Sequence, residues 1–341
     1  MWLLFVCVPC KAGSESEHGQ SEKRSACMAS GEGEEVMKSY LNPHIRTPKS
    51  TKVIMRDVCV SLIPAFIGSV YFFGVGAFYL TLACVATCIA TEYAWQKFNR
   101  LPATFDFSAA VTGILLAFNL SSNTPVWVAV VASMFSIIVV KQCFGGIGSN
   151  FANPALMGRL FVMFIYPSKL MNYAIPGVDG TSGATVLSAI KHGEEITYSV
   201  WDMFIGRIPG ALGETSALLL LLGFVYLAVR KDLNWIVSVV YIGTTTLVCS
   251  IAGVDPLVSL LGGGLILGGC YMLTDYTLAT SRLNIVIAVL AGLITAVIRI
   301  FSPTYPEGVC FAILAVNVLL YYIEQLKKPH IYGVAPAKKT E

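Results

Sequence analysis

Charged side chains are scarce in this sequence. Only 13% of its 341 residues are Asp, Glu, Lys or Arg, whereas soluble domains carry roughly 25%. So few solvated groups cannot cover a globule of this size, and the composition therefore excludes an ordinary soluble protein. The net charge of +3 is small. We expect a lipid bilayer around the chain and no nucleic-acid partner.

The spacing of the cysteines excludes two further kinds of site. None of the ten falls into a group with iron–sulfur or zinc spacing, so we expect no metal ligands. Cys7 and Cys10 have the spacing of a redox motif but no βαβ context. Cys84 and Cys88, one helical turn apart, are typical of small apolar packing residues in a membrane protein.

The N-terminus lacks a usual signal peptide. Met1–Pro9 is apolar, but it has no basic segment before it and is shorter than a usual signal core. Ser14–Glu35 is polar, charged and poor in aromatic residues, which is typical of a disordered tail. We therefore favour Met37 over Met1 as the biological start, with residues 1–36 disordered or an over-extended gene start.

Long apolar runs dominate the rest of the chain. Many are about 17–25 residues long, which is enough to cross the hydrocarbon core of a bilayer. They predict an all-α polytopic membrane protein of about ten helices. The expected spans are roughly 54–72, 75–95, 106–119, 125–141, 153–167, 214–229, 234–252, 256–273, 283–299 and 308–325. The expected parts are a tail (1–52), a five-helix half (53–167), an outer loop (168–213), a second half (214–325) and a tail (326–341).

Lys and Arg are unevenly distributed over the predicted loops. All but four of the 23 lie in the two tails, in alternate short loops or at the adjoining helix ends. Because short loops rich in Lys and Arg stay in the cytoplasm, both termini are predicted to be cytoplasmic and the loop 168–213 extracytoplasmic. The four exceptions are Lys169, Lys191, Arg207 and Arg299.

Few ionisable residues lie near the predicted spans, and all lie close to span ends. We expect them to be solvated there, with Asp106 and Asp275 the nearest to candidates for an ion path. The set is Asp57, Glu92, Asp106, Asp255, Asp275 and Arg299.

Two Gly-rich segments, 145–150 and 206–213, each precede an apolar span, one in each half. Unwound backbone at membrane depth is tolerated where it is buried or lines a cavity. Since five spans precede the outer loop, the second half is inverted, and such paired interruptions are typical of a 5+5 inverted repeat with a central site. Close helix packing explains the same glycines equally well.

The longest polar gap contains the segment Asp179-Gly180-Thr181-Ser182-Gly183-Ala184-Thr185. Its small residues give a modifying enzyme access to the terminal hydroxyl. No neighbouring residue can deprotonate Thr185, so it is a poor nucleophile but a plausible acceptor for a group attached by another enzyme. An ordinary capped surface turn is the alternative interpretation.

A short helix is expected after this segment. Thr181 or Ser182 can cap it, and its apolar face comprises Val186, Leu187 and Ile190. Free backbone N–H groups at its start favour a phosphate there, to which Lys191 adds an attraction.

The segment 179–185 resembles the flavinylation signal of the RnfD/NqrB family of membrane flavoproteins. Companion motifs occur in the family's order, and the resemblance covers about Tyr40 to Lys328. The companions are Asn42–Arg46, Gly145–Ala155, Gly210–Ser216 and Thr274-Asp275. Length and the short N-terminal extension favour the RnfD branch. The family's Thr-Asp-x-Val-Thr-x-Pro segment reads Thr274-Asp275-Tyr276-Thr277-Leu278-Ala279-Thr280 here, which departs from that pattern.

The resemblance implies a covalent FMN held through its phosphate on Thr185, which makes the chain a phosphoprotein. Ser182, Gly183 and Ala184 then give a flavin transferase steric access, and Asp179 helps that enzyme to recognise the loop. By similarity to NqrB, a second, non-covalent flavin lies near the Gly-rich helix breaks.

The resemblance also implies a membrane subunit of an Rnf-type complex in the bacterial cytoplasmic membrane. Together with the other Rnf subunits it passes electrons between ferredoxin and NAD, coupled to Na+ or H+ translocation. No catalytic residue is expected in this chain alone. Two alternatives remain: an NqrB-type subunit of a Na+-translocating NADH:quinone oxidoreductase, and a secondary transporter with inverted repeats and no cofactor.

Overall fold

The computed structural model describes residues 50–100, 105–148, 150–177, 182–183, 185–191, 198–214, 216–273, 284–302 and 308–326. The chain separates into two units, 1–50 and 51–341, and all the described helices and strands belong to the second. The predicted tail 1–36, the motif Asn42–Arg46, almost all of the C-terminal tail and the segment around Asp275 lie outside the described residues.

The first half of the chain forms helices separated by short turns. They are α3 (Thr51–Phe73), α4 (Val75–Phe98), α5 (Ser108–Phe118), α6 (Val126–Phe135), the π-helical η1 (Ser136–Gln142) that continues it, and α7 (Pro154–Ile165). Short elements follow in the predicted outer loop. They are α8 (Pro167–Leu170), β1 (Tyr173–Ala174), β2 (Ser182–Gly183), α9 (Val186–Lys191) and α10 (Val200–Ile205).

The second half is also helical. Its elements are α11 (Ala217–Arg230), α12 (Trp235–Ile251), α13 (Pro256–Leu261), α14 (Leu265–Leu267), the π-helical η2 (Gly268–Met272), α16 (Asn284–Phe301) and α17 (Val309–Leu326). A helical segment therefore lies at each of the ten predicted positions, and the helical fold class is confirmed. Among the described helices, α3, α4 and α16 are each long and apolar enough to cross a membrane.

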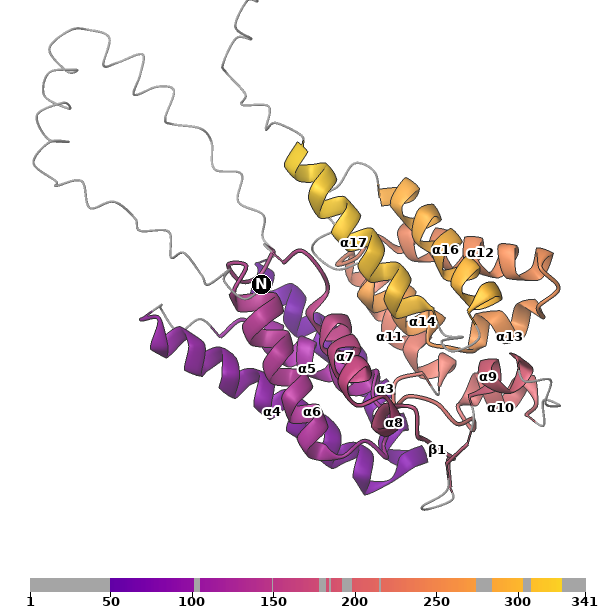
Figure 1. Ribbon diagram of the computed structural model, residues 1–341, viewed down its shortest axis with the longest axis horizontal. Helices are drawn as coiled ribbons and strands as arrows, with labels where there is room; N and C mark the ends of the chain where they lie inside the picture. The colour runs from indigo at the N-terminus through magenta and orange to yellow at the C-terminus, as the bar shows by residue number, and fades with distance from the viewer. Residues whose placement is uncertain are drawn as a thin grey trace, which may run out of the picture. The chain divides into compact units, whose positions relative to one another are not determined.

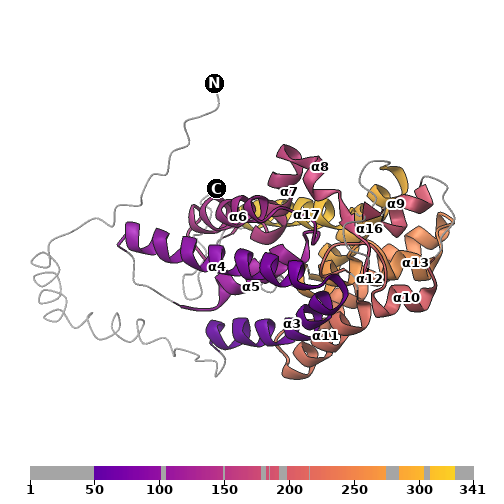
Figure 2. The same ribbon diagram turned by 90° about the horizontal axis from the view of Figure 1, so that it is seen from below.

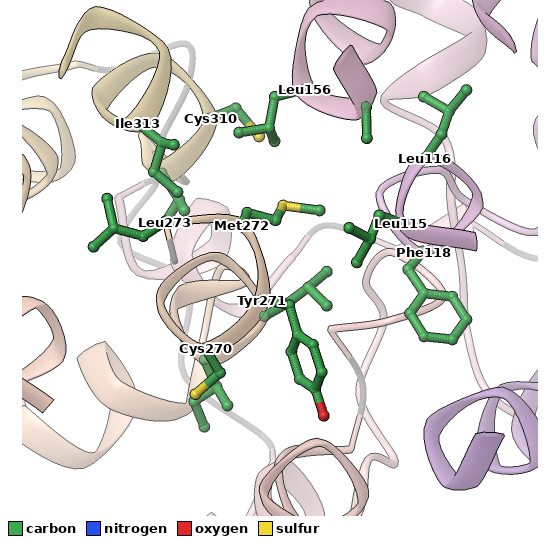
Figure 3. Close-up of a cluster of buried hydrophobic side chains, with 14 of the residues drawn as sticks. Leu115, Leu116, Phe118, Leu156, Cys270, Tyr271, Met272, Leu273, Cys310 and Ile313 are labelled. Carbon is green, nitrogen blue, oxygen red and sulfur yellow. The ribbon is translucent and has the colours of Figure 1, made fainter. Parts of the chain in front are cut away.

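Two groups of helices make up this unit, the indigo-to-magenta group α3–α8 and the orange-to-yellow group α11–α17 (Figures 1 and 2). The groups meet where α3 packs against α11 and where α7 packs against α17. The core between them is apolar and is drawn from helices far apart in the sequence. Figure 3 shows Leu156 of α7 beside Cys310 of α17, and Met272 of η2 pointing towards Leu115 of α5.

Glycines at positive φ precede α7 and interrupt the eighth predicted span. Gly145, Gly146 and Gly148 adopt positive φ before α7, a conformation that side chains rarely tolerate. The Asn153 side chain then caps α7 by accepting hydrogen bonds from backbone N–H groups, with Pro154 as the first helical residue. In the second half, Gly263 and Gly264 at positive φ divide the eighth predicted span into α13 and α14.

Candidate functional site

Thr185 lies immediately before α9 and caps it. Its hydroxyl accepts the Ser188 backbone N–H at 3.4 Å, and its carbonyl accepts that of Ala189 at 2.9 Å. The residue is only 7% exposed. The hydroxyl is therefore held at a helix start, as the sequence predicted, but in a buried position rather than on an accessible turn.

Helix α9 is docked onto α13. Val186 and Leu187 are buried, and Leu187 lies against Gly262, the residue that ends α13. At the far end of α9, the Lys191 ammonium donates to the carbonyl of Ser302, just after α16. Partial burial lowers the pKa of Lys191 from its ordinary value of 10.5. The predicted apolar face of this helix is confirmed for Val186 and Leu187, whereas Ile190 is only half-buried.

Helix α9 starts at Val186, later than a cap at Thr181 or Ser182 would place it. Residues 182–183 form β2 instead, paired antiparallel with β1 through Ala174↔Ser182 and Tyr173↔Gly183. Gly183 lies close to the side chains of Ile175 and Pro209. A Cβ added at this position would lie 3.1 Å from the nearest Ile175 atom. Asp179, Thr181 and Ala184 lie outside the described residues.

A cavity of about 200 Å³ lies among α3, α5, η1, α7, α11 and η2, beside the first Gly-rich break. We call it the Lys141 cavity. Its polar lining comprises Ser108, Thr112, Lys141, Asn150, Asn153, Asp232 and Tyr271. The Asn150 Oδ1 atom is buried and makes no hydrogen bond within the described part of the chain. Because buried polar atoms are normally paired, this oxygen indicates a place for a ligand donor.

The Lys141 side chain is 2% exposed, and its ammonium lies 2.6 Å from Glu92 Oε1. It also donates to the Ser108 hydroxyl, which in turn donates to Asp106 at 2.7 Å. Gln142 donates to the same Glu92 oxygen at 2.8 Å. A buried charge needs such partners, so this polar chain makes the burial of Lys141 tolerable.

A second buried cation, Arg159 of α7, lies between the two groups of helices. Its Nη1 lies 3.1 Å from Asn119 Oδ1 after α5 and 3.2 Å from Cys310 Sγ of α17. The Glu214 carboxylate, at the end of the second Gly-rich segment, is 3.9 Å away. This cluster connects the two halves of the chain through polar groups.

The prediction that the ionisable residues near the spans are solvated was wrong for three of them. Asp57 is 1% exposed and accepts from Arg230 of α11 at 2.6 Å. Glu92 pairs with Lys141, and Arg299 is buried with its guanidinium on the carbonyls of Ser259, Gly262 and Gly263. Asp255 is exposed, as expected, and caps α13.

Sequence reasoning missed Lys141 and Arg159 because it counted them only as cytoplasmic positive charges. For Lys141 a signal was present, since it follows the apolar run Ile137–Val140 without a break. For Arg159 the signal was its place inside a helix of otherwise apolar residues and glycine. A basic residue within such a stretch needs a partner in the interior.

Comparison with known proteins gives a consistent result over nearly the whole chain. The family model described as "NQR2, RnfD, RnfE family" matches residues 38–333. A curated relative from Acetobacterium woodii, the D subunit of a Na(+)-translocating ferredoxin:NAD(+) oxidoreductase complex, is 42% identical over 305 residues. That alignment covers 87% of this chain and 96% of the relative.

Two further relatives have similar names. The D subunit of the proton-translocating ferredoxin:NAD(+) oxidoreductase complex of Clostridium ljungdahlii is 33% identical, over 86% of this chain and 95% of the relative. The D subunit of the ion-translocating oxidoreductase complex of Stutzerimonas stutzeri is 32% identical, over 82% of this chain and 91% of the relative.

Proposed function

The chain belongs to the NQR2, RnfD, RnfE family, and from that premise we propose that it is the RnfD-type membrane subunit of an ion-translocating ferredoxin:NAD oxidoreductase complex. The observation that carries the proposal is 42% identity to such a subunit over nearly the full length of both chains. Relatives named for Na+ and for proton translocation both match, so the proposal covers either ion. The other subunits of that complex are the partners, and the chain is not a stand-alone catalyst.

We further propose that FMN is attached to Thr185. The Thr185 oxygen displaces the leaving group of an activated flavin phosphate supplied through a transferase. A P–O bond to the threonine oxygen forms, and the P–O bond between the flavin phosphate and its nucleotide leaving group breaks. The hydroxyl proton passes to a base of the transferase. When bound, the flavin supplies the redox chemistry, and the protein supplies its position and electrostatic environment.

The geometry around Thr185 supports this attachment and adds one requirement. The hydroxyl lies next to backbone N–H groups at a helix start, which suits a phosphate. Because the residue is 7% exposed, the transferase must act while α9 is away from α13. Ser182, Gly183 and Ala184 then give the transferase steric access, and Asp179 helps it to recognise the segment.

The Lys141 cavity is the proposed place for the second, non-covalent flavin. An isoalloxazine ring offers an imide N–H between two carbonyl oxygens at one edge. The buried Asn150 oxygen can accept the N–H, while the Lys141 ammonium and the Asn153 amide can donate to carbonyls. Apolar residues of α3, α5 and α11 form much of the remaining lining, as is common for cofactor sites.

Two of the buried cations, Lys141 and Arg299, support the proposed inverted repeat. Each lies fifteen residues after the start of the fourth helical segment of its half, which begins at Val126 in one and at Asn284 in the other. Each also contacts the third segment, Lys141 at Ser108 and Arg299 at Ser259. Such matched positions are expected if ten spans form two inverted halves.

The proposed location is the bacterial cytoplasmic membrane, with both termini cytoplasmic and Thr185 on the outer side. The distribution of Lys and Arg supports the orientation. Large apolar side chains on the outer faces of the helices support embedding in lipid, among them Ile67 of α3, Tyr79 of α4 and Val229 of α11, which are 62%, 61% and 76% exposed.

The alternatives make different predictions. An NqrB-type subunit would be encoded beside a NADH:quinone oxidoreductase module, whereas an RnfD-type subunit would be encoded beside the iron–sulfur and NAD modules of the Rnf complex. A cofactor-free transporter would carry no flavin at all. The gene neighbourhood therefore distinguishes the first two, and flavin content distinguishes both from the third.

The deciding experiment on the covalent flavin is fluorescence of the denatured chain on a gel under ultraviolet light, after co-expression with a flavin transferase. The parent chain should fluoresce and Thr185→Val should not. Ser188→Ala, which removes the next hydroxyl on α9, should fluoresce like the parent. A dark parent chain contradicts the covalent flavin, and a fluorescent Thr185→Val chain shows that another residue carries it.

A further inference from the structure

The Lys141–Glu92 ion pair separates two cavities and has a defined direction. Lys141 and its partner Ser108 line the Lys141 cavity. Glu92 and Asp106 instead line a second cavity of about 250 Å³, between α4 and the segment leading into α5. The positive end of the pair therefore faces the proposed flavin cavity, whereas Glu92 and Asp106 face away from it; among the described residues, the one acidic residue in the lining of the Lys141 cavity is Asp232.

We propose that Lys141 is a positioning residue whose fixed charge makes the flavin in the Lys141 cavity easier to reduce. The inference rests on the second flavin of the proposed function and adds the residue that sets its electron affinity. Adding electrons to a flavin increases negative charge on the pyrimidine part of its ring. An ammonium bordering the cavity stabilises that charge strongly, because both are shielded from bulk water.

Glu92 makes the buried charge tolerable without cancelling its effect. A lone buried ammonium is strongly destabilising, and a carboxylate 2.6 Å away compensates it. Since Glu92 does not line the Lys141 cavity, its charge acts on a ligand there from a greater distance than that of Lys141. The pair as a whole is neutral, but it presents a positive potential to the flavin.

The geometry also fixes the charge in one place. The Lys141 ammonium contacts Glu92 and Ser108, and Ser108 is itself held by Asp106 through its hydroxyl. Lys141 lies on the π-helical η1 rather than on a regular α-helix, and such segments are frequent at functional sites. A charge held by its surroundings needs no reorganisation when the flavin is reduced.

The test is a redox titration of the full-length chain purified in detergent, depleted of non-covalent flavin and reloaded with riboflavin. The main variant is Lys141→Met/Glu92→Gln, which removes both charges and leaves no unpaired buried carboxylate. We expect it to bind riboflavin but to lose at least tenfold of its preference for the reduced over the oxidised form. That loss is a drop of about 30 mV in the two-electron midpoint potential.

Three controls separate this effect from general damage. Lys141→Arg keeps the charge and should keep the potential close to that of the parent. Thr246→Val, on α12 and outside the lining of the Lys141 cavity, removes a hydroxyl without changing charge and should leave the potential unchanged. In every variant, the covalent flavin on Thr185 should be attached at parental yield and titrate as in the parent, which reports that the chain is folded.

The outcomes are distinguishable. If the double variant binds riboflavin with an unchanged potential, or loses riboflavin while the covalent flavin is normal, the inference about Lys141 is wrong. The proposed second flavin then still stands if the parent chain binds riboflavin. If the parent chain itself holds no extractable flavin and binds no riboflavin, the proposed second site fails and the inference fails with it. The covalent flavin on Thr185 survives either result.

Discussion

The Arg159 guanidinium and the Glu214 carboxylate, both buried, lie 3.9 Å apart between the two halves of the chain. Arg159 belongs to α7, and Glu214 ends the Gly-rich segment before α11. The backbone reinforces this junction, because the N–H groups of Leu212 and Gly213 donate to the carbonyls of Leu120 and Phe118 at the end of α5. The outer loop therefore returns to the first half before the second half begins.

Removing one partner of this pair should destabilise the protein more than removing both. Arg159→Met or Glu214→Gln alone leaves the other side chain in a buried site built for an opposite charge, which costs about 3–5 kcal/mol. The double variant should recover part of that loss. Thermal unfolding of the purified chain in detergent measures it, and a loss in the double variant equal to the sum of the two single losses would contradict coupling between these residues.

Weaker docking of α9 should speed attachment of the flavin. Leu187→Ala removes apolar contact with α13 at Gly262 and should populate the undocked state in which Thr185 is accessible. The measurement is the initial rate at which gel fluorescence appears when the purified chain is mixed with transferase and its flavin donor. Ser188→Ala, half-exposed on the same helix, is the matched control. A rate in Leu187→Ala equal to or below that of the control would show that the docked form is the substrate.

The docking of α9 should also depend on pH in the alkaline range. The docked Lys191 has its pKa lowered from 10.5 by burial, so the docked state binds fewer protons than the undocked state between the lowered pKa and 10.5. Docking is therefore weakest below the lowered pKa and strengthens as pH rises towards 10.5. Hydrogen exchange of the Ala189 amide, corrected for the intrinsic rate at each pH, should show increasing protection over this range. In Lys191→Met the corrected protection should be flat.

The sequence alone predicted the positions of the helices but not what their charged residues contact. Apolar runs are local, and each of the ten predicted spans contains a helical segment. Partners such as Glu92 and Lys141 lie on different helices, so only the fold brings them together. Position near a helix end suggested solvation, whereas Asp57 and Glu92 are buried against cations from neighbouring helices.

The candidate site was predictable in part for a similar reason. Thr185 at a helix start follows from local sequence, since small polar residues precede an apolar face. Its burial does not, because it depends on α13, which lies far along the chain. Thr181 or Ser182 was expected to cap the helix; Ser182 instead lies in an extended strand, where β2 pairs with β1, and such pairing is not visible in local propensity.

A matched pair of glycines tests how closely α3 and α11 pack against each other. At Gly223 of α11, a Cβ would lie 2.0 Å from the Ser61 carbonyl oxygen of α3 and 2.2 Å from the Tyr271 hydroxyl. Gly223→Ala should therefore force α3 and α11 apart, with a loss of about 1–3 kcal/mol in the free energy of unfolding. Gly243 of α12 has no atom within 4 Å of the added Cβ, so Gly243→Ala should be neutral or stabilising by up to about 1 kcal/mol.

Because α3 and Tyr271 also border the Lys141 cavity, Gly223→Ala should weaken riboflavin binding as well, whereas Gly243→Ala should not. Thermal unfolding in detergent and a riboflavin titration measure the two effects, and similar behaviour of the two variants would show that α3 and α11 are not in close contact here.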